Sequence, residues 1–150
     1  MKKRILIIGN NEFSREYYED GVFKINHKKY IKALYQKYEI DNLSKDSLSC
    51  DSAIRMSKFY TENNKYSSCI IALGLDEARR NTVEELKDKL STLLEELISK
   101  DIEPILLEID SEKYNVSLAN SVIREVKKEY KLSQDMYNDL IVNGSKLQFC

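Results

Sequence analysis

The sequence predicts an α/β protein, a three-layer α/β/α sandwich around a parallel sheet of four or five strands. Short apolar runs alternate with longer segments in which apolar residues recur at helical spacing, as in parallel strands joined by helices. The run Ile5-Leu6-Ile7-Ile8 has no polar position, which is typical of a central strand covered on both faces. The 150 residues contain no repeat and no Pro- or Gly-rich linker, so we expect a single domain over residues 1–150.

Five segments are candidate strands. The segments 5–8 and 69–73 are apolar throughout, whereas 40–43 is more polar and is expected nearer an edge. The run over 104–109 predicts a fourth strand. Pro104 fits at its first position, because proline is tolerated where a strand begins. A short fifth candidate covers 132–136. Right-handed crossovers predict the order 2-1-3-4 for the first four strands.

Four segments carry apolar residues at helical spacing. The clearest is 83–99, and the others are 27–38, 51–63 and 117–130. Thr82 and Glu85 have the S/T-x-x-E spacing of a capping box, so we expect them to cap the first of these helices. No segment approaches the length of a membrane span.

Counts of single residue types exclude several classes of site. His27 is the only histidine, which excludes zinc sites with several histidines and mechanisms with two imidazoles. Cys50, Cys69 and Cys150 are widely spaced and predict reduced thiols in a cytoplasmic protein. The 24 basic and 25 acidic residues nearly cancel, so we expect no nucleic-acid partner and no membrane partner. The oligomeric state has no signal in the sequence.

Two loops after predicted strands carry polar residues of interest. Ligands of open parallel sheets bind at the carboxyl ends of the strands. Gly9-Asn10-Asn11 follows the first strand, and Gly74-Leu75-Asp76-Glu77 follows the third. Neither loop has a dinucleotide-binding or P-loop motif, so we expect no cofactor. The pairing of these loops, and the order of elements between them, resembles the SGNH, or GDSL-type, hydrolases.

The resemblance covers nearly the whole chain and implies a flavodoxin-like, SGNH-hydrolase-like fold. Members of that family are esterases and acylhydrolases with a serine after the first strand, oxyanion donors from a glycine and an asparagine, and a C-terminal Asp-x-x-His. In this sequence Asn11 stands at the nucleophile position, Lys45 near the oxyanion glycine, and Asp76 at the oxyanion asparagine. The stretch 134–137 resembles the approach to Asp-x-x-His, but no histidine follows His27.

These departures predict a domain without acyl-hydrolase activity. An amide nitrogen cannot replace the alkoxide of acyl transfer, and a carboxylate would repel a developing oxyanion. We therefore expect a domain retained for ligand or partner binding, with no catalytic residue and no metal. Any retained pocket is expected to favour a small neutral or cationic polar ligand such as a sugar or an amine. Its predicted lining is Gly9, Asn10, Asn11, Gly74 and Asp76.

Two alternatives stay open. One is an active esterase or acylhydrolase that acts on a small acyl ester through a different arrangement of residues. The other is a magnesium-dependent activity, with the cation held by oxygens of the same two loops, Glu12 and Glu77 included. The more ordinary expectation is that the loop carboxylates are solvated or paired with Arg79 and Arg80.

Three further polar features have structural interpretations that we favour. His27 is expected to be a solvated side chain where a helix begins. Ser14 is expected to cap a helix or form a turn, with a displaced nucleophile as the alternative. The stretch Tyr17-Tyr18-Glu19-Asp20 is expected to be a surface loop, with a carbohydrate or peptide cleft as the alternative.

Overall fold

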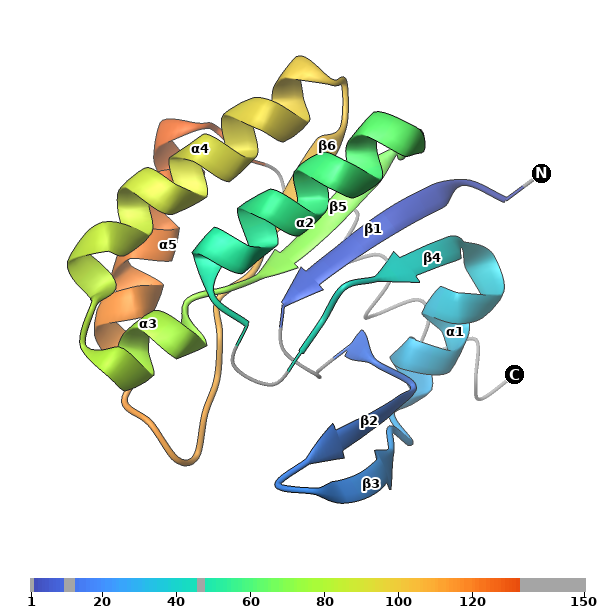
Figure 1. Ribbon diagram of the computed structural model, residues 1–150, viewed down its shortest axis with the longest axis horizontal. Coiled ribbons are helices and arrows are strands. Elements are labelled where there is room, and N and C mark those ends of the chain that lie inside the picture. The colour runs from blue at the N-terminus through green and yellow to red at the C-terminus, as the bar shows by residue number, and fades with distance from the viewer. Residues whose placement is uncertain (1, 10–12, 46–47, 133–150) are drawn as a thin grey trace.

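The central sheet confirms the predicted α/β class (Figure 1). A computed structural model describes residues 2–9, 13–45 and 48–132. All three strand pairings of the central sheet are parallel and give the order β4-β1-β5-β6, which is the predicted order 2-1-3-4. The predicted strand over 132–136 lies, from position 133 onward, outside the described residues. The four strands are β1 (Arg4–Gly9), β4 (Glu39–Asn42), β5 (Ser68–Ala72) and β6 (Glu103–Leu106).

The fourth strand is shorter than predicted. It ends at Leu106, although the Leu107 N–H still donates to the Ile71 carbonyl at 2.9 Å and both Leu107 and Ile109 are buried. These two side chains pack into the cores on opposite faces of the sheet. The apolar run therefore continues past the last strand pairing, and burial alone does not mark where a strand ends.

The four predicted helices are present, with one difference at the start of the clearest. Residues Val83–Glu85 form a 3-10 turn ahead of the main helix, and Thr82 makes no side-chain capping hydrogen bond. The predicted capping box is therefore wrong, because Thr82 has a ψ of 31° and not the extended backbone of an N-cap residue. The helices are α1 (Lys29–Lys37), α2 (Cys50–Asn63), α4 (Leu86–Ser99) and α5 (Ser117–Glu129).

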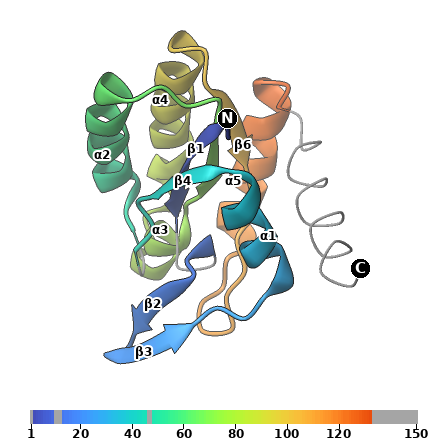
Figure 2. The ribbon, with the colours of Figure 1, turned by 90° about the vertical axis from the view of Figure 1, so that its right-hand side faces the viewer.

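Both faces of the sheet are covered, which makes the three layers. Alternate residues of β1 point to opposite faces: Leu6 and Ile8 join the core shared with α2, α4 and α5, whereas Ile5 and Ile7 join the core with α1. Figure 2 shows α2 and α4 on one side of the sheet and α1 on the other. All four of these β1 side chains are fully buried, as predicted for a central strand.

Two elements at the carboxyl edge of the sheet were not predicted. A short helix, α3 (Leu75–Arg80), follows β5. An antiparallel hairpin of β2 (Glu16–Glu19) and β3 (Val22–Ile25) projects beyond the sheet (Figure 1), so the surface loop expected over 17–20 is instead a strand and a turn. No helix within the described ranges is long and apolar enough to cross a membrane.

Candidate functional site

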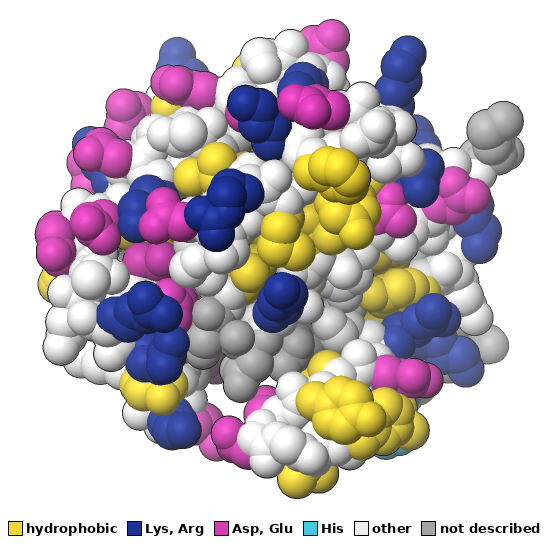
Figure 3. Space-filling model, in the orientation of Figure 1, with side chains coloured by type: hydrophobic (Ala, Val, Ile, Leu, Met, Phe, Trp, Pro, Cys, Tyr) yellow, Lys and Arg dark blue, Asp and Glu magenta, His cyan; other side chains and the backbone are white. Residues whose placement is uncertain are grey.

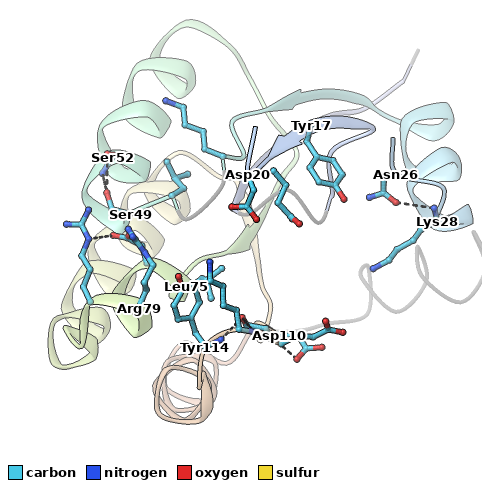
Figure 4. Close-up of a pocket in the computed structure, with 18 residues that line it drawn as sticks. Tyr17, Asp20, Asn26, Lys28, Ser49, Ser52, Leu75, Arg79, Asp110 and Tyr114 are labelled. Atoms are coloured by element: carbon cyan, nitrogen blue, oxygen red, sulfur yellow. Dashed lines mark hydrogen bonds and ion pairs between the residues drawn. The ribbon is translucent and has the colours of Figure 1, made fainter. Parts of the chain in front are cut away.

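A cleft of about 1020 Å³ opens at the carboxyl edge of the sheet, where the resemblance implies a pocket. Five segments form its walls: the hairpin, the connection between β3 and α1, the loop between β4 and α2 with the start of α2, helix α3, and the loop between β6 and α5. Figure 4 shows Tyr17 of the hairpin and Tyr114 of the last loop on opposite sides of it. Residues about 97 positions apart in sequence thus face one cavity, because every connection at this edge follows a parallel strand.

Asp76 lies in the wall of the cleft and is paired with two guanidinium groups. Its side chain is 3% exposed, and its Oδ1 lies 2.5 Å from Arg79 Nη2 while its Oδ2 lies 3.3 Å from Arg80 Nε. All three residues belong to α3, at the i,i+3 and i,i+4 spacing that brings side chains together. The expected pairing of this carboxylate with both arginines is confirmed, and it offsets the charge of Asp76.

Glu77 points away from the cleft and holds the start of α2. Its Oε2 accepts a hydrogen bond from the backbone N–H of Cys50 at 3.1 Å, and its Oε1 accepts one from the Cys50 thiol at 3.6 Å. The first backbone N–H groups of a helix have no partner within it, and a negative charge is favourable there. Glu77 is thus used as a buried helix cap, and burial and this carboxylate raise the pKa of the Cys50 thiol.

Gly9 and Gly74 are required by the backbone. A Cβ at Gly9 would lie 2.6 Å from the carbonyl oxygen of Ala72 on β5. Gly74 has a φ of 122°, which L side chains rarely adopt, and starts α3 at the end of β5. Both glycines are buried and are not among the residues that line the cleft; they let β1 approach β5 and let α3 begin. Asn10 and Asn11, also predicted to line the pocket, lie outside the described residues.

The loop after β4 contributes a cation to the cleft. Its backbone runs beside the end of β1, since Lys45 N–H donates to the Gly9 carbonyl at 2.9 Å. Lys45 lines the cleft, at the position where the resemblance implies an oxyanion glycine. Ser49 and Ser52, at the start of α2, line the same wall, and the Ser49 hydroxyl accepts from the Ser52 N–H.

The loop after β6 is fixed by one asparagine side chain. Asn120 of α5 accepts a hydrogen bond from Ile109 N–H and donates one to the Ile109 carbonyl, both at 2.8 Å. These two bonds lie directly ahead of Asp110 and Tyr114, which line the cleft. The end of the predicted strand over 104–109 is therefore anchored to α5, and this contact fixes where the cleft wall begins.

The hairpin contributes Tyr17, Glu19 and Asp20 to the cleft, and the sequence contained its signal. Asp20 and Gly21 have φ values of 52° and 78° and form the turn between β2 and β3. An Asp-Gly pair is among the strongest short signals for a tight hairpin turn, because both positions need a positive φ. Of the two tyrosines in this stretch, Tyr17 lines the cleft. Tyr18 does not line it, and its side chain is 67% exposed.

Ser14 and His27 do not form a catalytic pair in this structure. Ser14 precedes a strand, so the expected helix cap is wrong; its hydroxyl accepts a hydrogen bond from Asn42 Nδ2 at 3.2 Å. His27 is exposed two residues before α1, as predicted. Within the described ranges, no group of three His, Cys, Asp or Glu side chains is arranged to hold a metal ion.

The charges of the cleft are balanced. Among the residues that the structure describes, five acidic and five basic side chains line it. Aromatic rings and hydroxyl groups lie between them, namely Tyr17, Tyr114, Ser49, Ser52 and Ser111. Such a lining offers hydrogen-bond donors and acceptors without a strong net charge.

Comparisons with known proteins place this fold. The sequence matches no protein-family model and no curated protein. Among solved structures, it is similar to AlinE4, an SGNH-hydrolase family esterase, with a TM-score of 0.67 and 18% identity over 89% of this chain and 75% of that one. The psychrotrophic esterase EstA from Pseudoalteromonas sp. gives a TM-score of 0.66 and 16% identity over 85% and 73%.

A GDSL-like lipase from Bacteroides thetaiotaomicron gives a TM-score of 0.63 and 14% identity, over 87% of this chain and 66% of that one. At these identities the similarity establishes the fold. The predicted resemblance to the SGNH/GDSL superfamily is therefore confirmed at the level of the fold.

Proposed function

We propose that this chain is a single SGNH-hydrolase-like domain that has lost acyl-hydrolase activity and binds a small polar ligand in the cleft. The observation that carries the proposal is Asp76. Where the resemblance implies an amide donor, the chain has a buried carboxylate held by Arg79 and Arg80. An acceptor at this place opposes a developing oxyanion instead of stabilising it.

The sequence adds a second obstacle to acyl transfer. Asn11 stands where the resemblance implies the nucleophilic serine, and the amide of asparagine supplies no comparable nucleophile. The chain's one histidine is exposed ahead of α1, and it does not contribute to the cleft lining. A hydrolase needs the nucleophile, the base and the oxyanion donors together, so these substitutions support the loss of activity as a group.

A neutral, hydroxyl-rich ligand such as a sugar suits the cleft best. The arginines offset the charge of Asp76, so its carboxylate gives little preference for a cation. Five acidic and five basic side chains favour neither sign of ligand charge. Tyr17 and Tyr114 offer ring faces and hydroxyls from two walls, a combination suited to ligands with both polar and apolar surface.

A cytoplasmic location is also part of the proposal. The free thiols of Cys50 and Cys69 support it.

Hydrolysis assays test the loss of activity. The protein is expected to hydrolyse p-nitrophenyl acetate and butyrate no faster than a heat-inactivated control. A fluorophosphonate probe, which needs an activated serine, is expected to leave it unlabelled. Stoichiometric labelling, mapped by mass spectrometry to Ser14, Ser44 or Ser47, would overturn the proposal in favour of an active esterase.

A thermal-shift screen tests the ligand class, with neutral sugars, amines, phosphate and divalent cations as probes. A sugar at about 100 times its dissociation constant stabilises the fold by about 2.7 kcal/mol, which raises the melting temperature by roughly 5–10 °C at this size. The shift should be lost in Tyr17→Ala and Tyr114→Ala. It should persist in Glu125→Ala, which removes an exposed ion-pair partner of Lys87 away from the cleft. Equal shifts of the melting temperature in all variants would show that the ligand does not bind in the cleft.

A further inference from the structure

The β2–β3 hairpin carries exposed apolar side chains on both of its faces. Its register pairs Tyr18 with Phe23 and Glu16 with Ile25, so these side chains share the face opposite Tyr17 and the cleft. The Tyr18 and Phe23 rings pack edge to face at 5.4 Å. Exposed fractions are 67% for Tyr18, 50% for Phe23, 54% for Ile25 and 57% for Val22, which lies on the other face. Figure 3 shows hydrophobic side chains gathered over the hairpin on the face in view.

A hairpin of this kind gains little from its own packing. Two strands alone are marginally stable in water, and all four residues of β3 are exposed. Contiguous exposed apolar surface of this sort usually marks a site of interaction. Among the residues that the structure describes, the other large exposed apolar side chains are Phe59, Ile98 and Leu118, which lie on three different helices. Within that part of the chain, such residues concentrate on the hairpin.

Positive charge is concentrated in the same part of the chain. From Phe23 to Tyr38 there is no acidic residue. This stretch holds five exposed lysines and one exposed histidine: Lys24, His27, Lys28, Lys29, Lys32 and Lys37. Between Arg15 and Tyr38 there are six basic and three acidic residues, so the segment carries +3 while the rest of the chain carries −4. The near-zero total on which the expectation of no membrane partner rested conceals this segregation.

The acidic residues of the hairpin have local reasons to be there. Glu19 accepts a hydrogen bond from Lys24 Nζ at 2.8 Å, which offsets its charge. Asp20 occupies a turn position with a φ of 52°, a conformation that aspartate tolerates better than most residues. Glu16 lies at the start of β2, away from the turn. The exposed apolar side chains of the hairpin thus lie beside an exposed Asp20, and the lysines follow in the next segment of the chain.

We propose that this hairpin, together with the lysines of α1, docks the protein on an anionic lipid bilayer. Tyr18, Val22, Phe23 and Ile25 would enter the interface between headgroups and acyl chains, where aromatic and aliphatic side chains are favoured. Exposed lysines beside them bind anionic headgroups. A segment with five lysines and no acidic residue, from Phe23 to Tyr38, matches the negative charge of such a bilayer. Cytoplasmic leaflets carry anionic lipids, which suits the proposed location.

Vesicle co-sedimentation of the full chain tests the docking. The protein is expected to sediment with phosphatidylcholine vesicles that contain one-third phosphatidylserine, and to bind vesicles of phosphatidylcholine alone at least about tenfold more weakly. Raising the salt concentration should weaken binding to the anionic vesicles, because salt screens the lysine–headgroup attraction. No sedimentation with anionic vesicles at low salt would overturn the proposal and leave the hairpin to a protein partner.

Matched surface variants test the orientation. Phe23→Ser with Ile25→Ser, and separately Lys29→Glu with Lys32→Glu, should each reduce binding about tenfold or more. The control pair is Lys58→Glu with Phe59→Ser on α2, where both side chains are exposed. The control should bind like the parent, with circular dichroism confirming that every variant is folded. Equal losses in the control would show non-specific adhesion and contradict the assigned face.

A fluorescence reporter separates insertion from mere adsorption. The chain contains no tryptophan, so Phe23→Trp supplies a single indole at the hairpin, which is excited selectively at wavelengths that tyrosine does not absorb. Its emission is expected to shift to the blue when anionic vesicles are added, because the indole leaves water for the interface. Phe59→Trp on α2 is the matched control and should not shift. An unchanged spectrum for Phe23→Trp in the sedimenting complex would refute insertion of the hairpin.

Discussion

Replacing Glu77 by glutamine tests whether a buried carboxylate holds the cleft wall in place. Glu77 is 3% exposed and joins α3 to the first turn of α2 through Cys50, 27 residues away in sequence. The Glu77→Gln change keeps the shape of the side chain but leaves one oxygen acceptor for two donors. The amide NH₂ would then face either the Cys50 N–H or its thiol, a contact between two donors.

The expected cost follows from these two contacts. A hydrogen bond to a charged group contributes about 1.5–3 kcal/mol, and a negative charge at a helix N-terminus adds up to about 1 kcal/mol. Since glutamine retains one acceptor, we expect Glu77→Gln to lower the free energy of unfolding by about 2 kcal/mol. At this chain length that corresponds to a melting temperature lower by roughly 4–8 °C.

Equilibrium unfolding in urea, followed by circular dichroism, measures this loss. Ser49→Ala removes the neighbouring cap of α2, where the hydroxyl accepts from Ser52 N–H, and should cost about 1 kcal/mol. Glu84→Gln, at an exposed position, should stay within about 0.5 kcal/mol of the parent. The reasoning is refuted if Glu77→Gln is as stable as Glu84→Gln, because Glu77 would then not act as a cap.

Three further predictions concern the strands, the thiols and the last loop. Gly9→Ala should destabilise the fold by about 2 kcal/mol or more in urea unfolding, because its Cβ would lie 2.6 Å from a carbonyl oxygen of β5; an unchanged midpoint would contradict the close approach. Burial raises the thiol pKa of Cys50 and Cys69, so peptide mapping should find both unmodified by iodoacetamide at about pH 8 in the folded protein. Raised thiol pKa values stabilise the fold below the pKa of the unfolded thiol, so stability should fall as the pH rises above about 8.5. Asn120→Ala removes both hydrogen bonds to Ile109 and should cost about 2 kcal/mol, with faster amide exchange over 109–114 as the direct measurement.

The elements of the sheet were predictable because their signals are local. In each strand and long helix, the spacing of the apolar residues indicates the type of element and the side of it that is buried. The continuous apolar runs at 5–8 and 69–73 were therefore enough to place the central strands. Pairing of Asp76 with Arg79 and Arg80 was expected because these residues are neighbours in the sequence, whereas the helix that sets their i,i+3 and i,i+4 spacing was not predicted.

The hairpin was a readable signal that the predictions missed. The pair Asp20-Gly21 stands between short runs with aromatic and β-branched residues, which is the pattern of a tight hairpin turn. The prediction of a surface loop followed from the polar residues around it. The resulting error matters for function, because this hairpin supplies one wall of the cleft and the surface proposed to meet a membrane.

The amino-acid sequence by itself determined the α/β class, the strand order, the loops at the carboxyl edge and the absence of a second histidine. Only the tertiary structure decided which polar side chains meet. It placed Glu77 on Cys50 rather than in a pocket, and it brought Tyr17 and Tyr114 to one cleft. The reason is physical: periodicity reports the burial of a segment on its own, whereas a contact between distant loops depends on how every intervening element packs.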